Sequence, residues 1–143
     1  MMEETLFRIP YWTIPTLNFS TKKKQLLTLL KAYPEKKHGM QTFITNRQSD
    51  RSNLAEAFAT ICGEELNMLS QQIKKDIQIE DIWSVSYKKG DYHTTHNHGS
   101  VGLTGILYLQ QDKKAPVTFI SHFTEPSKST TMKKIISWDM KII

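Results

Sequence analysis

The stretch Ile82-Trp83-Ser84-Val85-Ser86-Tyr87 decides the class of fold that the sequence predicts. Its large apolar side chains alternate with serines, and side chains two positions apart on a strand leave the same face of a sheet. A period of two returns in the segment 104–109, and the segments 117–120 and 134–138 are further strand candidates. Short strands separated by turn residues favour an antiparallel sandwich or barrel in this part of the chain.

The residues before Ile79 follow mainly helical periodicity. A first helix is expected to begin at an N-cap formed by Ser20 or Thr21 and to end before Pro34. A longer helix is expected after a cap at Asp50 or Ser52. Its buried face would hold Leu54, Phe58, Ile61, Cys62, Leu69 and Ile73. Short strands are also expected at residues 6–9 and 42–45.

These patterns predict one domain over residues 1–143. Its N-terminal half, about 1–78, is mainly helical, and its β-rich half, about 79–143, carries the candidate site. The predicted class is α+β. We expect a jelly-roll core, also called a double-stranded β-helix, with the N-terminal helices packed on one outer face.

Composition indicates an ordinary globular protein. The chain has 143 residues, of which 38% are hydrophobic and 23% charged, so it can bury a core. No apolar stretch approaches the roughly 20 residues that a membrane-spanning helix needs. The N-terminus is acidic and no apolar signal-peptide segment follows it, which predicts a cytoplasmic protein, in the host cytoplasm if a phage encodes it.

Charge and cysteine content narrow the functional classes further. The formal charge is +5, but the basic residues are mostly lysines without interleaved aromatics. We expect clusters such as Lys22–Lys24 to be solvated surface, and nucleic-acid binding to be unlikely. Cys62 is the single cysteine, which excludes an internal disulfide and a thiolate zinc cluster. Its helical pattern predicts a buried, inert thiol.

Histidines gather just after the first predicted strand of the β-rich half. The segment from Tyr87 to His98 contains His93, His96 and His98, which are three of the five histidines in the chain. If the strand continued, His96 and His98 would share one face and could grip a metal ion together. Imidazole ligands without thiolate suit iron(II), zinc, copper, nickel or manganese, and few protein ligands indicate a catalytic rather than a structural site.

The order of these motifs resembles the prolyl-hydroxylase-type iron(II)/2-oxoglutarate dioxygenases, especially small oxygenases of phages and marine bacteria. The resembling stretches are Trp83-Ser-Val-Ser-Tyr87, His96-Asn-His98 and Thr104-Gly-Ile-Leu-Tyr108-Leu109. Residues 9–12 and 43–46 are also similar. The resemblance implies a metal-binding oxidoreductase that uses Fe(II), 2-oxoglutarate and O2, with a primary substrate that it does not identify.

The resemblance also implies roles for single residues. His96 would be the first iron ligand, and His98 would stand where the wider superfamily has Asp or Glu. Tyr108 would help hold the distal carboxylate of 2-oxoglutarate, and Tyr87 would line the same pocket. Core packing is the alternative role for both tyrosines.

Two departures from the family pattern affect these roles. The carboxylate ligand is missing, and Asp91, His93 or His122 are the candidates to replace the missing ligands. The family's last motif is similar to Lys134-Ile-Ile-Ser-Trp138 and the residues after it, but the chain ends where the distal histidine would follow. We therefore expect no distal histidine and no carboxylate-binding Arg or Lys beyond it, as in a truncated or split product or in a degenerate relative, and such a chain need not be active.

Two other classes of protein stay open at the level of sequence. Gly90 followed by His96 and His98 also fits the opening of a cupin motif, although no Glu follows at cupin spacing. The other alternative is a non-catalytic phage accessory or interaction module that retains the jelly roll.

Overall fold

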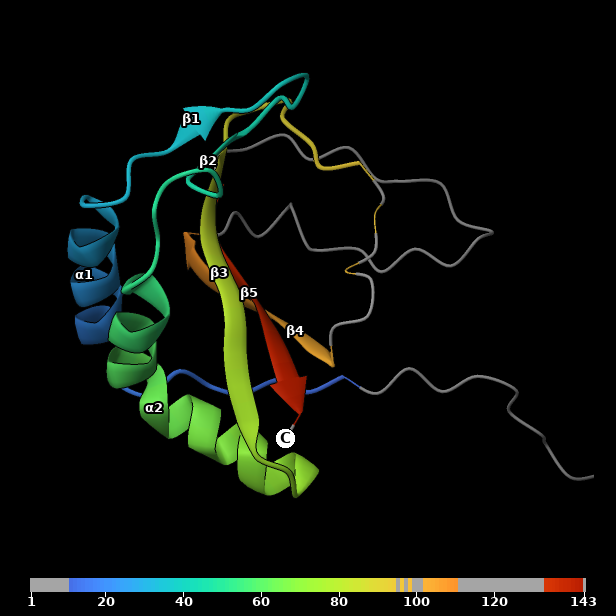
Figure 1. The fold of residues 1–143 in the computed structure, drawn as a ribbon. Helices are drawn as coiled ribbons and strands as arrows, with labels where there is room; N and C mark the ends of the chain where they lie inside the picture. Colours follow the sequence, from blue (N-terminus) through green and yellow to red (C-terminus); the bar gives the residue numbers. More distant parts are fainter. Residues whose placement is uncertain (1–10, 95, 97, 99–101, 111–132, 143) are drawn as a thin grey trace, which may run out of the picture.

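Three long antiparallel strands form the centre of the fold, and two helices pack beside them (Figure 1). The computed structural model describes residues 11–94, 96, 98, 102–110 and 133–142. The strands expected at 6–9 and 117–120 lie outside these residues. In chain order the elements are α1 (Phe19–Leu30), β1 (Lys36–Lys37), β2 (Ile44–Thr45), α2 (Leu54–Ile73), β3 (Ile77–Tyr87), β4 (Leu103–Gln110) and β5 (Lys133–Ile142).

The strands form a single five-stranded sheet in the order β1-β2-β3-β5-β4, and every neighbouring pair is antiparallel. The α+β class is therefore confirmed. The expected strands at 42–45, 104–109 and 134–138 correspond to β2, β4 and β5, and β3 begins two residues before Ile79. Within the described part of the chain, no helix is long and apolar enough to cross a bilayer.

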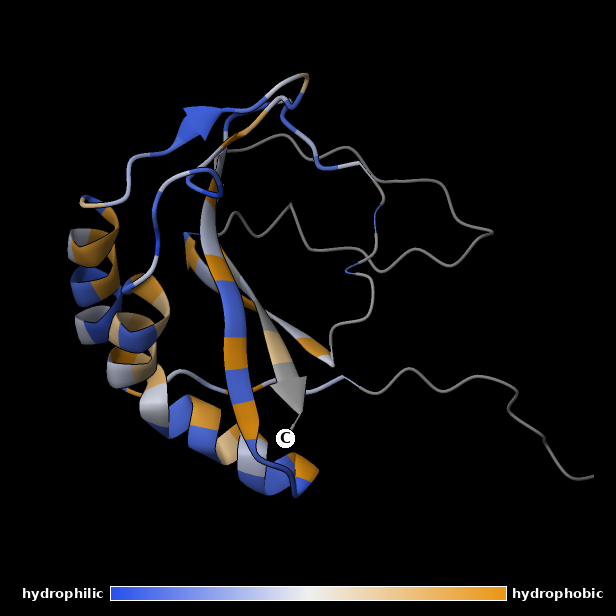
Figure 2. Ribbon diagram, in the orientation of Figure 1, coloured by the Kyte–Doolittle hydropathy of each residue, from blue (hydrophilic) through white to orange (hydrophobic). Residues whose placement is uncertain are grey.

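The sheet buries different side chains on its two faces, as the alternating hydropathy along β3 indicates (Figure 2). One face packs against both helices, which confirms the expected one-sided packing. This helix-side core contains Leu26, Leu30, Leu54, Phe58, Cys62, Ile82, Leu109 and Ile136. The opposite face carries a smaller cluster of Phe43, Trp83 and Val85, against which Tyr87 and Tyr108 pack.

A bulge in β3 brings two isoleucines of this strand to the same face of the sheet. Ile79 pairs with Met140 and Asp81 pairs with Asp139, so Glu80 is an extra residue in β3. Without it, Ile79 and Ile82 would point to opposite faces, because they are three positions apart. With it, both side chains reach the helix-side core.

The expected helix caps are wrong, although both helices are present. Asn18 precedes α1 in a left-handed conformation (φ 50°), and its carbonyl accepts hydrogen bonds from the first turn, so Ser20 and Thr21 lie inside the helix. Asn53 precedes α2. Asp50 instead accepts a hydrogen bond from the Ser52 N–H at 3.1 Å, which closes a turn before the helix.

Cys62 is buried in α2, as expected. It is 3% exposed, and burial raises the pKa of its thiol to about 11. Its backbone has non-helical angles (φ −108°, ψ 20°), which place a kink in the helix. A thiol that stays protonated and inaccessible at neutral pH is an inert packing group.

Lys22 corrects the expectation that the Lys22–Lys24 cluster is solvated. The Lys22 side chain is buried on α1, and its ammonium lies 2.9 Å from a Glu64 oxygen and 2.8 Å from a Glu65 oxygen on α2. Glu65 also accepts a hydrogen bond from the Leu17 N–H at 2.7 Å. This ion cluster therefore fastens α1 and the chain before it onto α2.

Acidification should weaken this attachment. Burial raises the pKa of Glu65, but hydrogen bonds from Lys22 and the Leu17 N–H outweigh it, so the net pKa is lowered. A carboxyl group with a lowered folded-state pKa stabilises the fold above its unfolded pKa, and that stability is lost as the pH falls through the folded value. Urea unfolding should show stability declining below about pH 4.5. Glu65→Gln should flatten this part of the profile, and an equally steep decline in the variant would refute the assignment.

Gly105 on β4 is required by the ring of Trp138 on β5. The two residues are paired across the strands, and a Cβ added at position 105 would lie 2.1 Å from the Trp138 ring. We expect Gly105→Ala to destabilise the fold by about 1–3 kcal/mol because the indole must shift in a packed core. Gly63→Ala is the control, since its added Cβ would meet no described atom within 4 Å apart from its chain neighbours and the backbone of its own helix. Equal stability of the two variants in urea unfolding would contradict this packing.

Candidate metal centre

The candidate site begins where β3 ends. Gly90 has a φ of 89°, a conformation that favours glycine, and the Asp91 carboxylate accepts a hydrogen bond from the Lys88 N–H at 2.7 Å. This turn stops the strand. The prediction that His96 and His98 continue a strand is therefore wrong, because both follow the turn in irregular backbone.

After the turn, the chain is fastened to the loop between β1 and β2. The Thr42 hydroxyl donates to the Tyr92 carbonyl at 3.1 Å and accepts from the Tyr92 N–H at 3.0 Å. Figure 1 shows this loop beside the segment that follows β3. The double contact positions the residue after it, His93, over the aromatic face of the sheet.

The structure brings together His93, His96 and His98, which we call the imidazole cluster. The rings of His93 and His96 stack with centroids 4.1 Å apart and 24° between their planes. The rings of His96 and His98 lie 5.1 Å apart at 49°. The two predicted metal ligands are thus neighbours, although they lie on no strand.

Aromatic side chains from β3 and the residue before β2 form the floor beneath this cluster. The His93 ring lies 4.5 Å from that of Phe43, and the His98 ring stacks on Trp83 at 6.0 Å and 18°. The Tyr87 hydroxyl lies 3.2 Å from His93 Nδ1. Because Phe43 and Trp83 are buried, the histidine rings pack on side chains that are fixed in the apolar cluster of the sheet.

Burial and charge keep His93 and Tyr87 neutral. Desolvation, the neighbouring His96 and His98, and Arg47 lower the pKa of His93 to about 4. Burial raises the pKa of Tyr87, and Tyr108 and Asp91 add to the effect. At neutral pH His93 is therefore an uncharged imidazole, and Tyr87 keeps its proton as a hydrogen-bond donor.

His96 is prepared to bind through one particular nitrogen. Its Nδ1 lies 2.8 Å from the Thr94 carbonyl oxygen. Since a carbonyl can only accept, the proton belongs on Nδ1, and the lone pair remains on Nε2. A backbone carbonyl that holds the second nitrogen in this way is the usual support of a metal-binding histidine.

The spacing of His96 and His98 fits two ligands of one ion. With a metal–nitrogen distance of about 2.1 Å, two adjacent ligand rings have centroids about 4.5–5.3 Å apart, and the observed separation is 5.1 Å. Among the residues that the structure describes, no group of three or more His, Cys, Asp or Glu side chains is arranged for a metal. The three histidines of the imidazole cluster therefore do not form such a group.

The other predicted residues have different positions. Tyr108 on β4 packs against the same aromatic cluster as Tyr87, so both tyrosines share the face of the imidazole cluster. Asp91 is engaged in the turn with Lys88, which accounts for its carboxylate without a metal. His122 lies outside the described residues.

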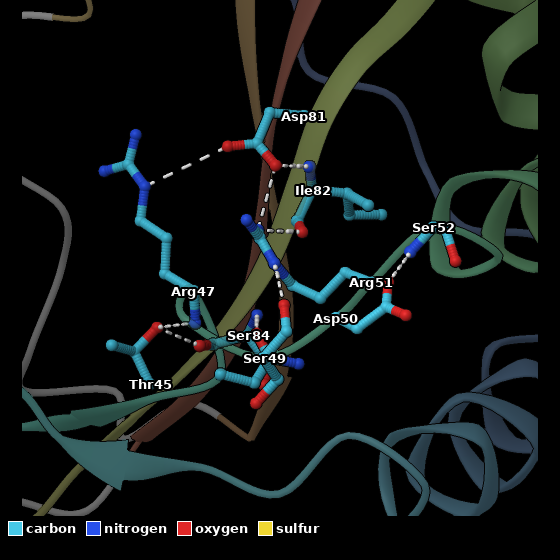
Figure 3. A network of polar contacts seen from close by, with 10 residues as sticks. Thr45, Arg47, Ser49, Asp50, Arg51, Ser52, Asp81, Ile82 and Ser84 are labelled. Carbon is cyan, nitrogen blue, oxygen red and sulfur yellow. Dashed lines mark hydrogen bonds and ion pairs between the residues drawn. The ribbon is translucent and has the colours of Figure 1, made fainter.

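Arg47 is a site residue that the sequence did not reveal. Its guanidinium carbon lies 4.3 Å from the centroid of the Trp83 ring, and it contributes to the lowered pKa of His93. Figure 3 shows its Nε turned toward Asp81, at 4.0 Å, while Arg51 takes the other Asp81 oxygen at 2.9 Å. A guanidinium held over an aromatic ring beside the cluster can receive a carboxylate.

The sequence matches no protein-family model and no curated protein.

Proposed function

We propose that the chain is an iron(II)- and 2-oxoglutarate-dependent oxygenase of the hydroxylase type, with His96 and His98 as metal ligands. One observation carries the proposal. Two histidines and two tyrosines from separate segments gather on the face of the sheet that the helices leave open, with adjacent histidine rings at 5.1 Å. A ligand pair with open coordination positions is typical of catalytic metal sites.

The finer architecture that we propose is a jelly roll. In such a fold, neighbouring strands of one sheet are often distant in sequence, because the chain alternates between two sheets. The order β3-β5-β4 is consistent with this, since β5 lies between two strands that precede it. The aromatic face that carries the imidazole cluster would then be the interior of the roll.

The side chains present fit the two cofactors in distinct ways. His96 would bind iron(II) through Nε2, and His98 would bind beside it. For 2-oxoglutarate, the Arg47 guanidinium supplies a positive charge beside the cluster. Tyr87 and Tyr108 offer hydroxyl groups on the same face. Bound iron(II) would allow O2, the oxidant, to hydroxylate a C–H bond: one oxygen atom would enter the substrate and the other would enter succinate as 2-oxoglutarate loses carbon dioxide.

Succinate formation tests this proposal. Protein loaded with iron(II) under argon is mixed with 2-oxoglutarate and oxygen, and succinate is followed by NMR. We expect succinate above the level produced by free iron(II), and a loss of this excess in His96→Ala. Met68→Ala is the control, because Met68 is an exposed side chain on α2, away from the imidazole cluster. If the wild-type protein binds iron(II) but forms no succinate above the level of free iron(II), the oxygenase proposal is contradicted, and a cupin-like metal-binding protein fits the result.

A further inference from the structure

A hollow lies directly beside the imidazole cluster. It is lined by residues 38–43 of the loop between β1 and β2 and by residues 92–94, and its volume is about 300 Å³. We call it the hairpin hollow. His93 forms part of its wall and also stacks on His96 at 4.1 Å, so the hollow and the proposed metal ligands share a side chain.

The chemistry of the lining restricts what can enter. Among the described residues that line it there is no Asp, Glu, Lys or Arg, while Phe43, Tyr92 and His93 supply aromatic rings. A charged ligand would lose hydration there without gaining an opposite charge, whereas a flat uncharged group can stack on the rings. The volume is at the lower end of the range for small-molecule sites, about 300–1,000 Å³, which suits a single small planar group.

Gln41 adds a directional requirement. Its Oε1 is buried and has no hydrogen-bond partner among the described residues. A buried acceptor without a donor is uncommon and costs free energy, so a donor supplied by a ligand would stabilise this arrangement. Gln41 itself lines the hollow, so a turn of the whole side chain about its Cβ–Cγ bond would bring Oε1 to a donor placed there.

We propose that the hairpin hollow receives the substrate of the oxygenase as an uncharged planar group with an N–H donor, such as a carboxamide. This inference rests on the function proposed above. The group stacks against the aromatic wall and donates to Gln41 Oε1. Because His93 lines the hollow and stacks on His96, the rest of the substrate would extend past His93, and its reacting carbon would lie near the metal.

Two small probes test the class of ligand. Benzamide has an aromatic ring and an N–H donor, and methyl benzoate has a similar shape without the donor. In ¹H–¹⁵N spectra we expect benzamide to shift the amide signals of residues 38–43 and 92–94. Methyl benzoate should bind at least about fivefold more weakly, the effect of one lost hydrogen bond. Gln41→Met, which keeps the length of the side chain, should bind both probes equally.

Equal binding of the two probes to the wild-type protein, or shifts elsewhere only, overturns the proposal whether or not the variant folds. Mn(II) provides the link to the metal. It should broaden the signals of bound benzamide in the wild type and not in His96→Ala. Retained benzamide preference without broadening would support the ligand class and overturn the link to the metal site, so the two failures are distinguishable.

Discussion

His96→Ala is expected to lower the affinity of the protein for iron(II) by at least about 100-fold. The substitution removes one of the two proposed metal ligands. Loss of a residue that only hydrogen-bonds to a ligand already lowers metal affinity by about 10–100-fold, so loss of a ligand should cost more. Anaerobic competition titration against a coloured iron(II) chelator measures the change. Because Nδ1 of His96 is engaged with the Thr94 carbonyl, the proposed site would use Nε2 as its ligand atom.

Two controls make this result specific. His38→Ala removes an exposed histidine that lies outside the imidazole cluster, and we expect its affinity to equal that of the wild type. His98→Ala should be as damaging as His96→Ala, because each ion needs both rings. An unchanged affinity in His96→Ala, or an equal loss in His38→Ala, would remove His96 from the metal centre.

Phe58→Ala should produce the largest loss of stability, about 3–5 kcal/mol in the free energy of unfolding. Phe58 is 1% exposed at the centre of the helix-side core, and its ring lies 4.9 Å from that of Trp138 on β5. The truncation leaves a cavity between α2 and the sheet. Urea unfolding measures the change, which is a large part of the roughly 5–15 kcal/mol that holds a domain of this kind together.

Met68→Ala is the matched control for this experiment. Met68 lies on the same helix but is 39% exposed, so its truncation should change the stability by no more than about 0.5 kcal/mol. A loss below about 1 kcal/mol for Phe58→Ala would mean that the helix does not pack on the sheet as described.

The elements were predictable because their signals are local. The leucine spacing of α1, the apolar stripe of α2 and the alternation in β3, β4 and β5 each depend on neighbouring residues only. The bulge at Glu80 and the burial of Lys22 were not predictable, since they depend on partners elsewhere. Lys22 meets Glu64 and Glu65 at separations of 42 and 43 residues, and no local pattern indicates such a pair.

The candidate site was predictable in its residues more than in its geometry. The spacing of His96 and His98 singled out the pair, but a strand was the wrong way to place them, because the turn at Gly90 ends β3. Their position depends on the bonds between Thr42 and Tyr92, which are 50 residues apart. Arg47 follows β2 in a polar segment, and only its contact with Trp83 reveals its place near the cluster.

X-ray absorption at the iron edge of the Fe(II)-loaded protein shows directly whether His96 and His98 bind one ion together. We predict one ion per chain with two imidazole nitrogens at about 2.1 Å, and fewer imidazole ligands in His96→Ala. A spectrum with oxygen ligands alone, or a protein that retains no iron, would contradict it.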